Sequence, residues 1–152
     1  MTAEIHILCV GKGAQDPAAT LAGRYLERLP VPVRLKEIGA RGGARVPERR
    51  RREGDRLRAR IPRGAFVIAL DEDGRSFSSA AFAAALARWQ EEGRPLAFLI
   101  GGADGLDPEL RAAADLRLSL SSMTWPHMLV RAMLAEQLYR AFSILKGHPY
   151  HR

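Results

Sequence analysis

The chain has 152 residues, a formal net charge of +7 at pH 7 and a sequence pI near 10.5. We expect one domain, 1–152, because this length supports a single hydrophobic core. The apolar runs are far shorter than the roughly 20 residues that cross a bilayer, so we expect no membrane segment and no signal peptide. Cys9 is the only cysteine. It is predicted to be a buried thiol in a cytoplasmic protein that has no disulfide and no metal site.

Short apolar runs alternate with segments of helical spacing along the chain. We predict strands at 5–10, 31–38, 65–70, 96–100 and 116–120, and helices at 18–29, 47–60, 80–92, 108–114 and 126–145. A glycine- and arginine-rich loop is expected at 39–46 and a turn at 71–74, and Gly54 weakens the helix in which it lies. Apolar strands that alternate with helices are typical of an α/β fold, with a mainly parallel sheet covered by helices on both faces.

Positive charge is concentrated between Arg41 and Arg63, where ten arginines stand against three acidic residues. A stretch of this kind is typical of contact with RNA or DNA. The alternative is a solvated helix face, because the preference for arginine over lysine can also reflect the base composition of the genome.

Three predicted strand ends carry glycine or hydroxyl residues. They are Leu70-Asp71-x-x-Gly74, Gly101-Gly102-x-x-Gly105, and residues 118–124 with Ser119, Ser121, Ser122 and Thr124. Ligands of open α/β sheets bind beyond the carboxyl ends of the strands, so the three segments together could form a cofactor cleft. The alternative for each segment is an ordinary turn between a strand and a helix.

The helix predicted at 126–145 has an apolar arc of roughly 200°, about twice what packing on one sheet requires. We expect the excess to form a homodimer interface. Arg131 lies within this arc, and a guanidinium cannot be buried without a partner. It needs a carboxylate, a cluster of carbonyls or an anionic ligand. The two interpretations are an ion pair between subunits and a contact with the phosphate or base of an RNA near the interface.

Three of the four histidines lie in or next to this helix. His127 opens the helix, where the helix dipole disfavours the protonated imidazole, so it could accept a proton or simply cap the helix. Trp125, held extended by the proline after it, could form a wall of an adenine pocket or pack in the core. His6 is predicted to be structural.

The chain ends in a tail of proton-transferring and cationic side chains, His148-Pro149-Tyr150-His151-Arg152. Imidazole and phenol groups are typical of acid–base chemistry. The alternative is an aromatic and basic surface segment.

These motifs, in this order, resemble one known family. The order is Leu-Asp-x-x-Gly, Ile-Gly-Gly-x-x-Gly-Leu, Leu-Ser-Leu-Ser-x-Met-Thr-Trp-Pro-His-x-x-x-Arg and the terminal His-Pro-Tyr-His-Arg. It is similar to that of the large-subunit (23S) ribosomal RNA pseudouridine-N3 methyltransferases, of the α/β-knot (SPOUT) superfamily. The resemblance covers essentially the whole chain. It implies a C-terminal trefoil knot, a homodimer formed at the knot, and S-adenosylmethionine as methyl donor.

The resemblance also implies which residues form the site. It places the cofactor at Leu70, Gly101, Gly102, Leu120, Ser121, Ser122, Met123, Thr124 and Trp125. The implied substrate is N3 of a pseudouridine in a stem-loop of 23S rRNA in the assembled ribosome. Two alternatives stay open: a non-enzymatic ribosome- or RNA-binding protein, and a SPOUT methyltransferase that acts on transfer RNA.

The implied reaction needs acid–base groups but no metal, because the methyl group of a sulfonium is already activated. The N3–H of pseudouridine is a weakly acidic imide, which must lose a proton to become a nucleophile. The candidates for this step are His127, His148, Tyr150 and His151 for proton transfer, and Arg131 and Arg152 for stabilising the anion. We expect the tail to cover the cofactor cleft of its own subunit or of the partner.

Overall fold

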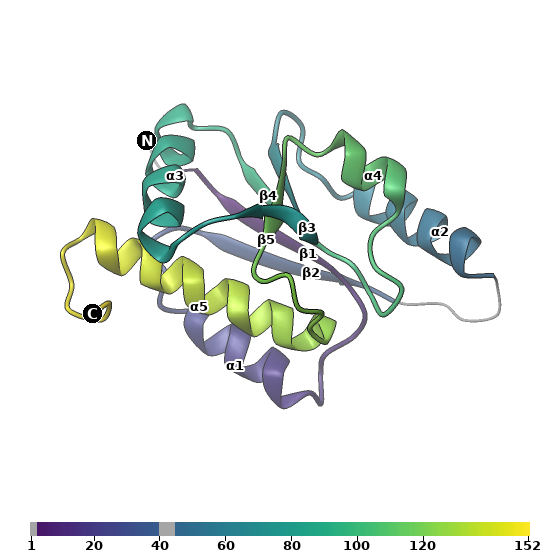
Figure 1. Ribbon diagram of the computed structural model, residues 1–152, viewed down its shortest axis with the longest axis horizontal. Helices are drawn as coiled ribbons and strands as arrows, with labels where there is room; N and C mark the ends of the chain where they lie inside the picture. Colours follow the sequence, from purple (N-terminus) through teal and green to yellow (C-terminus); the bar gives the residue numbers. More distant parts are fainter. Residues whose placement is uncertain (1–2, 40–44) are drawn as a thin grey trace.

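The computed structural model of the chain, which describes residues 3–39 and 45–152, has one five-stranded sheet at its centre (Figure 1). The strand order is β2-β1-β4-β3-β5, and all four pairings are parallel. The strands are β1 (Ile5–Val10), β2 (Val33–Ile38), β3 (Phe66–Ser76), β4 (Leu96–Ile100) and β5 (Leu116–Ser119). The helices are α1 (Pro17–Leu26), α2 (Val46–Arg58), α3 (Ser79–Glu92), α4 (Pro108–Ala113) and α5 (His127–Leu145). The predicted parallel α/β fold is confirmed.

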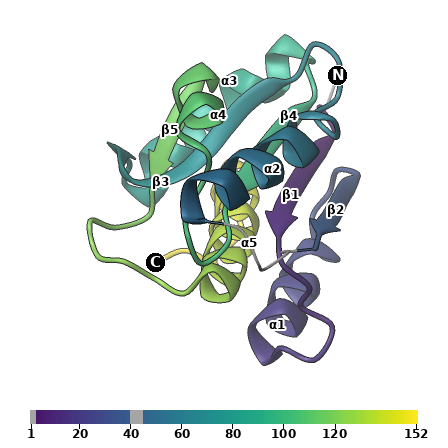
Figure 2. The ribbon, with the colours of Figure 1, turned by 90° about the vertical axis from the view of Figure 1, so that its right-hand side faces the viewer.

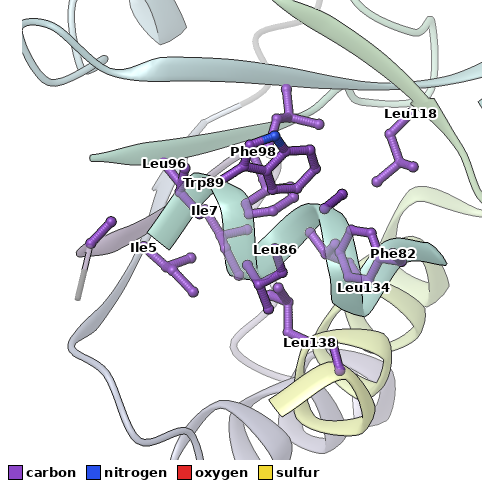
Figure 3. Packing of buried hydrophobic residues seen from close by; sticks show 14 of the residues in the cluster. Ile5, Ile7, Phe82, Leu86, Trp89, Leu96, Phe98, Leu118, Leu134 and Leu138 are labelled. Atoms are coloured by element: carbon purple, nitrogen blue, oxygen red, sulfur yellow. The ribbon is translucent and has the colours of Figure 1, made fainter. Parts of the chain in front are cut away.

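Helices cover both faces of the sheet, because every residue of the central strand β1 is buried and successive side chains point to opposite faces (Figures 1 and 2). Ile5 and Ile7 pack in the larger cluster with α3 and α5 (Figure 3). Leu8 and Val10 pack in the second cluster with α2 and α4. Cys9 is fully buried as predicted, and burial raises the pKa of its thiol to about 12, so it stays neutral at physiological pH.

The turn predicted at 71–74 does not end its strand, since β3 continues to Ser76. Leu118 of β5 pairs with both Leu70 and Arg75, so the four residues between them bulge out of the ladder. Asp71 holds the bulge by accepting a hydrogen bond from the backbone N–H of Asp73 at 3.0 Å. The turn chemistry was therefore predicted correctly, but the return of the chain to the same partner strand was not.

Gly54 lies inside α2 because only a glycine fits there. A Cβ at this position would lie 2.7 Å from the Cβ of Asp107, the N-cap residue of α4. The glycine lets α2 and α4 approach closely on one face of the sheet, which offsets its unfavourable helix propensity. Residues 40–44, which include Arg41 of the predicted loop, lie outside the described part of the chain.

The wide apolar arc of α5 is covered within the same chain, by α1 on one side and by α3 and the sheet on the other. Ala132 and Ala135 pack against Ala22 of α1, whereas Leu134 and Leu138 belong to the larger core cluster. The argument that the arc needs a second subunit to cover it is therefore wrong. The homodimer itself remains a prediction. No helix in 3–39 or 45–152 is both long and apolar enough to span a bilayer.

Candidate active site

A cleft of about 800 Å³ opens at the carboxyl ends of β3, β4 and β5, where the three motif segments converge. Eight of the nine residues predicted to bind the cofactor line it: Leu70, Gly101, Gly102, Leu120, Ser121, Met123, Thr124 and Trp125. Ser122 is exposed and does not line it. The volume is within the usual range for a small-molecule site. Trp125 remains 41% exposed at this cleft, so it does not pack in the core.

One wall of the cleft is the glycine-rich loop that follows β4. The backbone N–H of Gly105 donates to the carbonyl of Gly102 at 3.0 Å and closes a tight turn. A Cβ on Gly101 would lie 2.6 Å from the carbonyl carbon of Gly105, so no side chain fits at this position. The loop thus presents bare backbone to the cleft, a surface that a ligand can approach closely.

The opposite wall combines the β3 bulge with the loop after β5. Glu72 joins the two, because its carboxylate accepts a hydrogen bond from the Thr124 hydroxyl at 2.6 Å and its carbonyl accepts one from the Ser119 hydroxyl at 3.1 Å. The two bonds join residues that are 47 and 52 positions apart in sequence, and they hold the bulge and the loop together. This contact explains why the serine- and threonine-rich segment stays at the sheet edge.

Helix α2 contributes a third wall, which the sequence did not predict. Arg50 lines the cleft, and the neighbouring Arg49 forms an ion pair with Asp104 of the glycine-rich loop at 3.1 Å. Glu53 is buried on the same side, and burial together with the carboxylate of Asp104 raises its pKa. The run of four arginines at 49–52 predicted only a charged helix. No local pattern in the sequence indicated which of the four side chains lines the cleft.

Carboxylates outnumber guanidiniums in the lining. The charged lining residues are Asp71, Glu72, Asp73 and Asp104 against Arg50 and Arg111. The side chain of Asp71 is only 4% exposed, and its Oδ2 lies 3.7 Å from Arg111 and 3.6 Å from Arg117. Nearby arginines balance this charge, since Arg49 pairs with Asp104, and Arg111 and Arg117 both lie beside Asp71.

His127 lies at the mouth of the cleft, in the first turn of α5. Its Nδ1 is buried and has no hydrogen-bond partner among the described residues. No side chain caps the start of α5 in the described structure, since the N-cap residue is Pro126. A half-buried imidazole with an unused nitrogen beside a cleft can donate a proton to a bound ligand or accept one from it.

Arg131, one turn further along α5, is 2% exposed and is bound within its own chain. Its Nη1 lies 2.5 Å from Oε2 of Glu37, and its Nη2 donates to the carbonyl of Gly11 at 2.8 Å. Glu37 also accepts a hydrogen bond from the N–H of Gly13. Burial opposes the ionisation of Glu37, but the bonds from Arg131 and Gly13 outweigh it and lower its pKa. The buried guanidinium thus has the carboxylate and carbonyl partners that it needs, but they lie within one chain and not across a subunit interface as expected. A contact of Arg131 with RNA stays a prediction.

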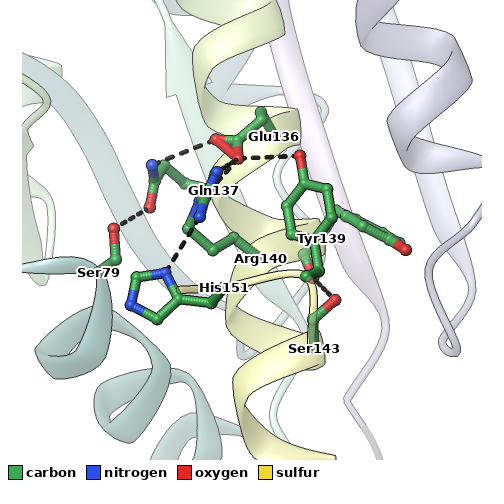
Figure 4. A network of polar contacts seen from close by, with 8 residues as sticks. Ser79, Glu136, Gln137, Tyr139, Arg140, Ser143 and His151 are labelled. Atoms are coloured by element: carbon green, nitrogen blue, oxygen red, sulfur yellow. Dashed lines mark hydrogen bonds and ion pairs between the residues drawn. The ribbon is translucent and has the colours of Figure 1, made fainter. Parts of the chain in front are cut away.

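The tail folds back onto α5 instead of covering the cleft of its own chain (Figures 1 and 4). The Tyr150 hydroxyl donates to Glu136 at 3.3 Å, and Nδ1 of His151 lies 3.0 Å from Arg140. With a helical rise of 1.5 Å per residue, Glu136 and Arg140 lie about 13 and 20 Å from His127 along α5. None of residues 148–152 lines the cleft, so tail and cleft do not meet within one chain.

Sequence reasoning missed the two residues that hold the tail, Glu136 and Arg140. They form an ion pair at 2.7 Å one turn apart, and Arg140 also stacks over the ring of Tyr150 at 4.9 Å. Burial, the phenol of Tyr25 and the carboxylate of Glu136 raise the pKa of Tyr150 to about 12. Tyr150 is thus a neutral hydrogen-bond donor at physiological pH. The sequence did offer one signal for these two residues, because Glu136 and Arg140 are an oppositely charged i,i+4 pair on a helix that is otherwise mostly apolar.

The tail lies beside a second hollow, a groove of about 640 Å³ between α1, α3 and α5. Leu21 and Leu129 line it and are 44% and 41% exposed. Tyr25 and Glu136, which neighbour Tyr150, belong to the same lining. An apolar groove with exposed leucines is typical of a protein-interaction surface.

Known proteins resemble this chain over nearly its full length. A sequence profile of the family described as Predicted SPOUT methyltransferase matches residues 3–151. The relatives named "Ribosomal RNA large subunit methyltransferase H" in Rhodospirillum centenum and Roseobacter denitrificans are 50% and 52% identical, and each match covers 97% of this chain and 98% of the relative. A probable methylase family protein from Haemophilus influenzae has a similar fold, with a TM-score of 0.61 at 11% identity over 100% of this chain and 72% of that one. The chain belongs to the SPOUT methyltransferase family.

Proposed function

We propose that this protein transfers a methyl group from S-adenosylmethionine to N3 of a pseudouridine in a stem-loop of 23S rRNA, in the assembled ribosome. The observation that carries the proposal is the cleft at the strand ends, which is lined by eight of the nine residues that the family motifs indicate. The names of the relatives, which are about half identical over almost the whole chain, support ribosomal RNA of the large subunit as substrate.

The residues of the cleft fit this cofactor. The glycine-rich loop lines the cleft without side chains at positions 101, 102 and 105, and the exposed indole of Trp125 offers a stacking surface for an adenine. When bound, the cofactor supplies an activated methyl group. The eight motif residues that line the cleft would hold it, with Leu70 and the lining residues of the 120–125 segment on one side and the glycine loop on the other.

His127 is our candidate for the group that removes the proton from N3–H. It is the one predicted proton-transferring residue that lines the cleft of its own chain, and its Nδ1 is unpaired among the described residues. Tyr150, whose pKa is raised to about 12, acts as a hydrogen-bond donor and not as the base. Arg131 is a positioning residue: it fixes the first turn of α5, and hence His127, to Glu37 and to the end of β1.

The remaining groups come from a second subunit. We propose a homodimer that is formed through the apolar groove along α1 and α5, which the exposed leucines at 21 and 129 support. The tail of one subunit, with His148, His151 and Arg152, then reaches the cleft of the partner. This arrangement supports two tasks for the tail, to hold the target base and to stabilise its anion.

The test is methyl transfer by the purified protein with radiolabelled S-adenosylmethionine. The acceptors are 70S ribosomes that lack the modification, free 23S rRNA and total transfer RNA. We expect label in 23S rRNA of the ribosomes and little in the other two. Label in transfer RNA alone would favour a different SPOUT activity. A pure RNA-binding protein would transfer none and would give no saturable heat with the cofactor in calorimetry.

A further inference from the structure

The exposed arginines of α2 have no function in the reaction described above. Residues 45–63 hold nine arginines and three acidic residues, a net charge of +6 out of +7 for the whole chain. The rest of the sequence is therefore close to neutral. We propose that Arg51 and Arg52 of α2 bind phosphates of the RNA strand that enters the cleft. This inference rests on the proposed function, and it names the surface that docks the substrate.

The two arginines differ from Arg56 and Arg58 of the same helix in their contacts with the described residues. Arg56 donates to the carbonyl of Gly39 at 2.7 Å, and Arg58 pairs with Asp55 at 2.9 Å. Arg51 and Arg52 are exposed and make no ion pair or hydrogen bond with any described residue. Their donors are thus free for an external anion, and a guanidinium matches the geometry of a phosphate.

Helix α2 lies at the edge of the cleft, so its arginines are close to the cleft entrance. Arg50, which precedes the pair, lines the cleft and has a buried Nε without a partner among the described residues. The Arg49–Asp104 ion pair ties this part of the helix to the glycine-rich wall. Figure 2 shows α2 along one side of the sheet, on the face away from α1 and α5. Arg51 and Arg52 follow Arg50 on the same helix but do not line the cleft, so in this proposal they meet phosphates that flank the bound nucleotide, outside the cleft.

The test replaces both arginines by glutamine, which keeps helix propensity and removes the charge. The matched control is R24Q/R88Q, which removes two exposed arginines from α1 and α3 on the other face of the sheet. Affinity for 70S ribosomes is measured without cofactor at several salt concentrations, and methyl transfer separately. Oligomeric state and cofactor affinity are compared for all variants.

We expect R51Q/R52Q to bind ribosomes roughly tenfold more weakly. The slope of log affinity against log salt should fall by about 1.5 to 2, which corresponds to two lost phosphate contacts. The kcat at saturating ribosomes and the cofactor affinity should stay within about twofold of wild type, and R51K/R52K should restore binding because it restores the charge.

Equal ribosome affinity of R51Q/R52Q and R24Q/R88Q would contradict the proposed docking surface, whatever the methyl-transfer assay shows. A wild-type protein that binds ribosomes through these arginines but transfers no methyl group would instead overturn the proposed function. If the substitutions only damage α2, R51Q/R52Q should also lose cofactor affinity, and R51K/R52K should not restore ribosome binding. That result would also contradict a role of the two arginines in docking.

Discussion

The buried guanidinium of Arg131 fixes where the first turn of α5 lies. It joins this turn to Glu37 at the end of β2 and to the carbonyl of Gly11 after β1, across 94 and 120 residues of sequence. A guanidinium that loses its carboxylate in such a site is left as an uncompensated buried charge. The ion pair therefore holds His127 in place, and loss of either partner should strongly destabilise the fold.

Glu37→Gln should lower the free energy of unfolding by about 2–4 kcal/mol at neutral pH. The pKa of Glu37 is lowered in the folded protein, so its contribution is complete above the ordinary value of 4.5 and is lost as the pH falls through the lowered value. Urea denaturation of both proteins should show a difference that narrows below pH 4.5. Glu27→Gln, at an exposed position, serves as control. A difference that stays constant with pH would contradict the role of the ion pair.

Gly101→Ala should reduce the affinity for S-adenosylmethionine at least tenfold, since the added Cβ would lie 2.6 Å from backbone and must distort the loop. Gly23→Ala is the matched control, because a Cβ there meets nothing within 4 Å. In the middle of α1 this change should stabilise the protein by about 0.4–1 kcal/mol. Calorimetry and thermal unfolding measure the two effects. Unaltered cofactor affinity in Gly101→Ala would refute the position of the site.

At the scale of elements, the tail contacts α5 at Glu136 and Arg140, about 13 and 20 Å along the helix from His127. Deletion of residues 148–152 should therefore leave cofactor affinity within about twofold of wild type but abolish methyl transfer, because in our proposal the tail acts on the substrate and not on the cofactor. Cofactor titration and a methyl-transfer assay test this. Lys146→Gln, exposed at the C-cap of α5, should stay active. Full activity of the truncated protein would disprove a role for the tail.

Elements were predictable where the signal is local. Every strand and helix was predicted, and all ends but one lie within about three residues of those observed, because apolar runs and caps such as Ser78 of α3 are next in sequence to the elements that they form. The exception is β3, which ends at Ser76 and not at Leu70. The cleft residues followed from the rule that ligands bind at strand ends. The inward turn of Arg50, the Glu37 partner of Arg131 and the direction of the tail depend on contacts between distant segments. No spacing along the chain encodes these.

At the scale of the whole molecule, the cleft and the tail of one chain do not meet, and the dimer proposed above would bring the tail of one subunit to the cleft of its partner. Subunits with Gly101→Ala and an intact tail can be mixed with subunits that lack residues 148–152. At a cofactor concentration too low to load Gly101→Ala, each variant alone should show little activity. An equimolar mixture should recover about a quarter of the wild-type rate, because half of its dimers are mixed and each mixed dimer has one complete site of two. If the subunits demonstrably exchange and no activity is recovered, the tail does not act on the cleft of the partner. A monomeric protein in analytical ultracentrifugation would contradict the proposed dimer.

The central claim is that this chain methylates N3 of a pseudouridine in large-subunit rRNA. Mass spectrometry of 23S rRNA from a strain that lacks this protein tests it most directly. We predict that the stem-loop then contains pseudouridine without its N3-methyl group, and that the wild-type chain, but not Gly101→Ala, restores the methyl group. An N3-methylated pseudouridine that persists unchanged in the deletion strain would contradict the claim.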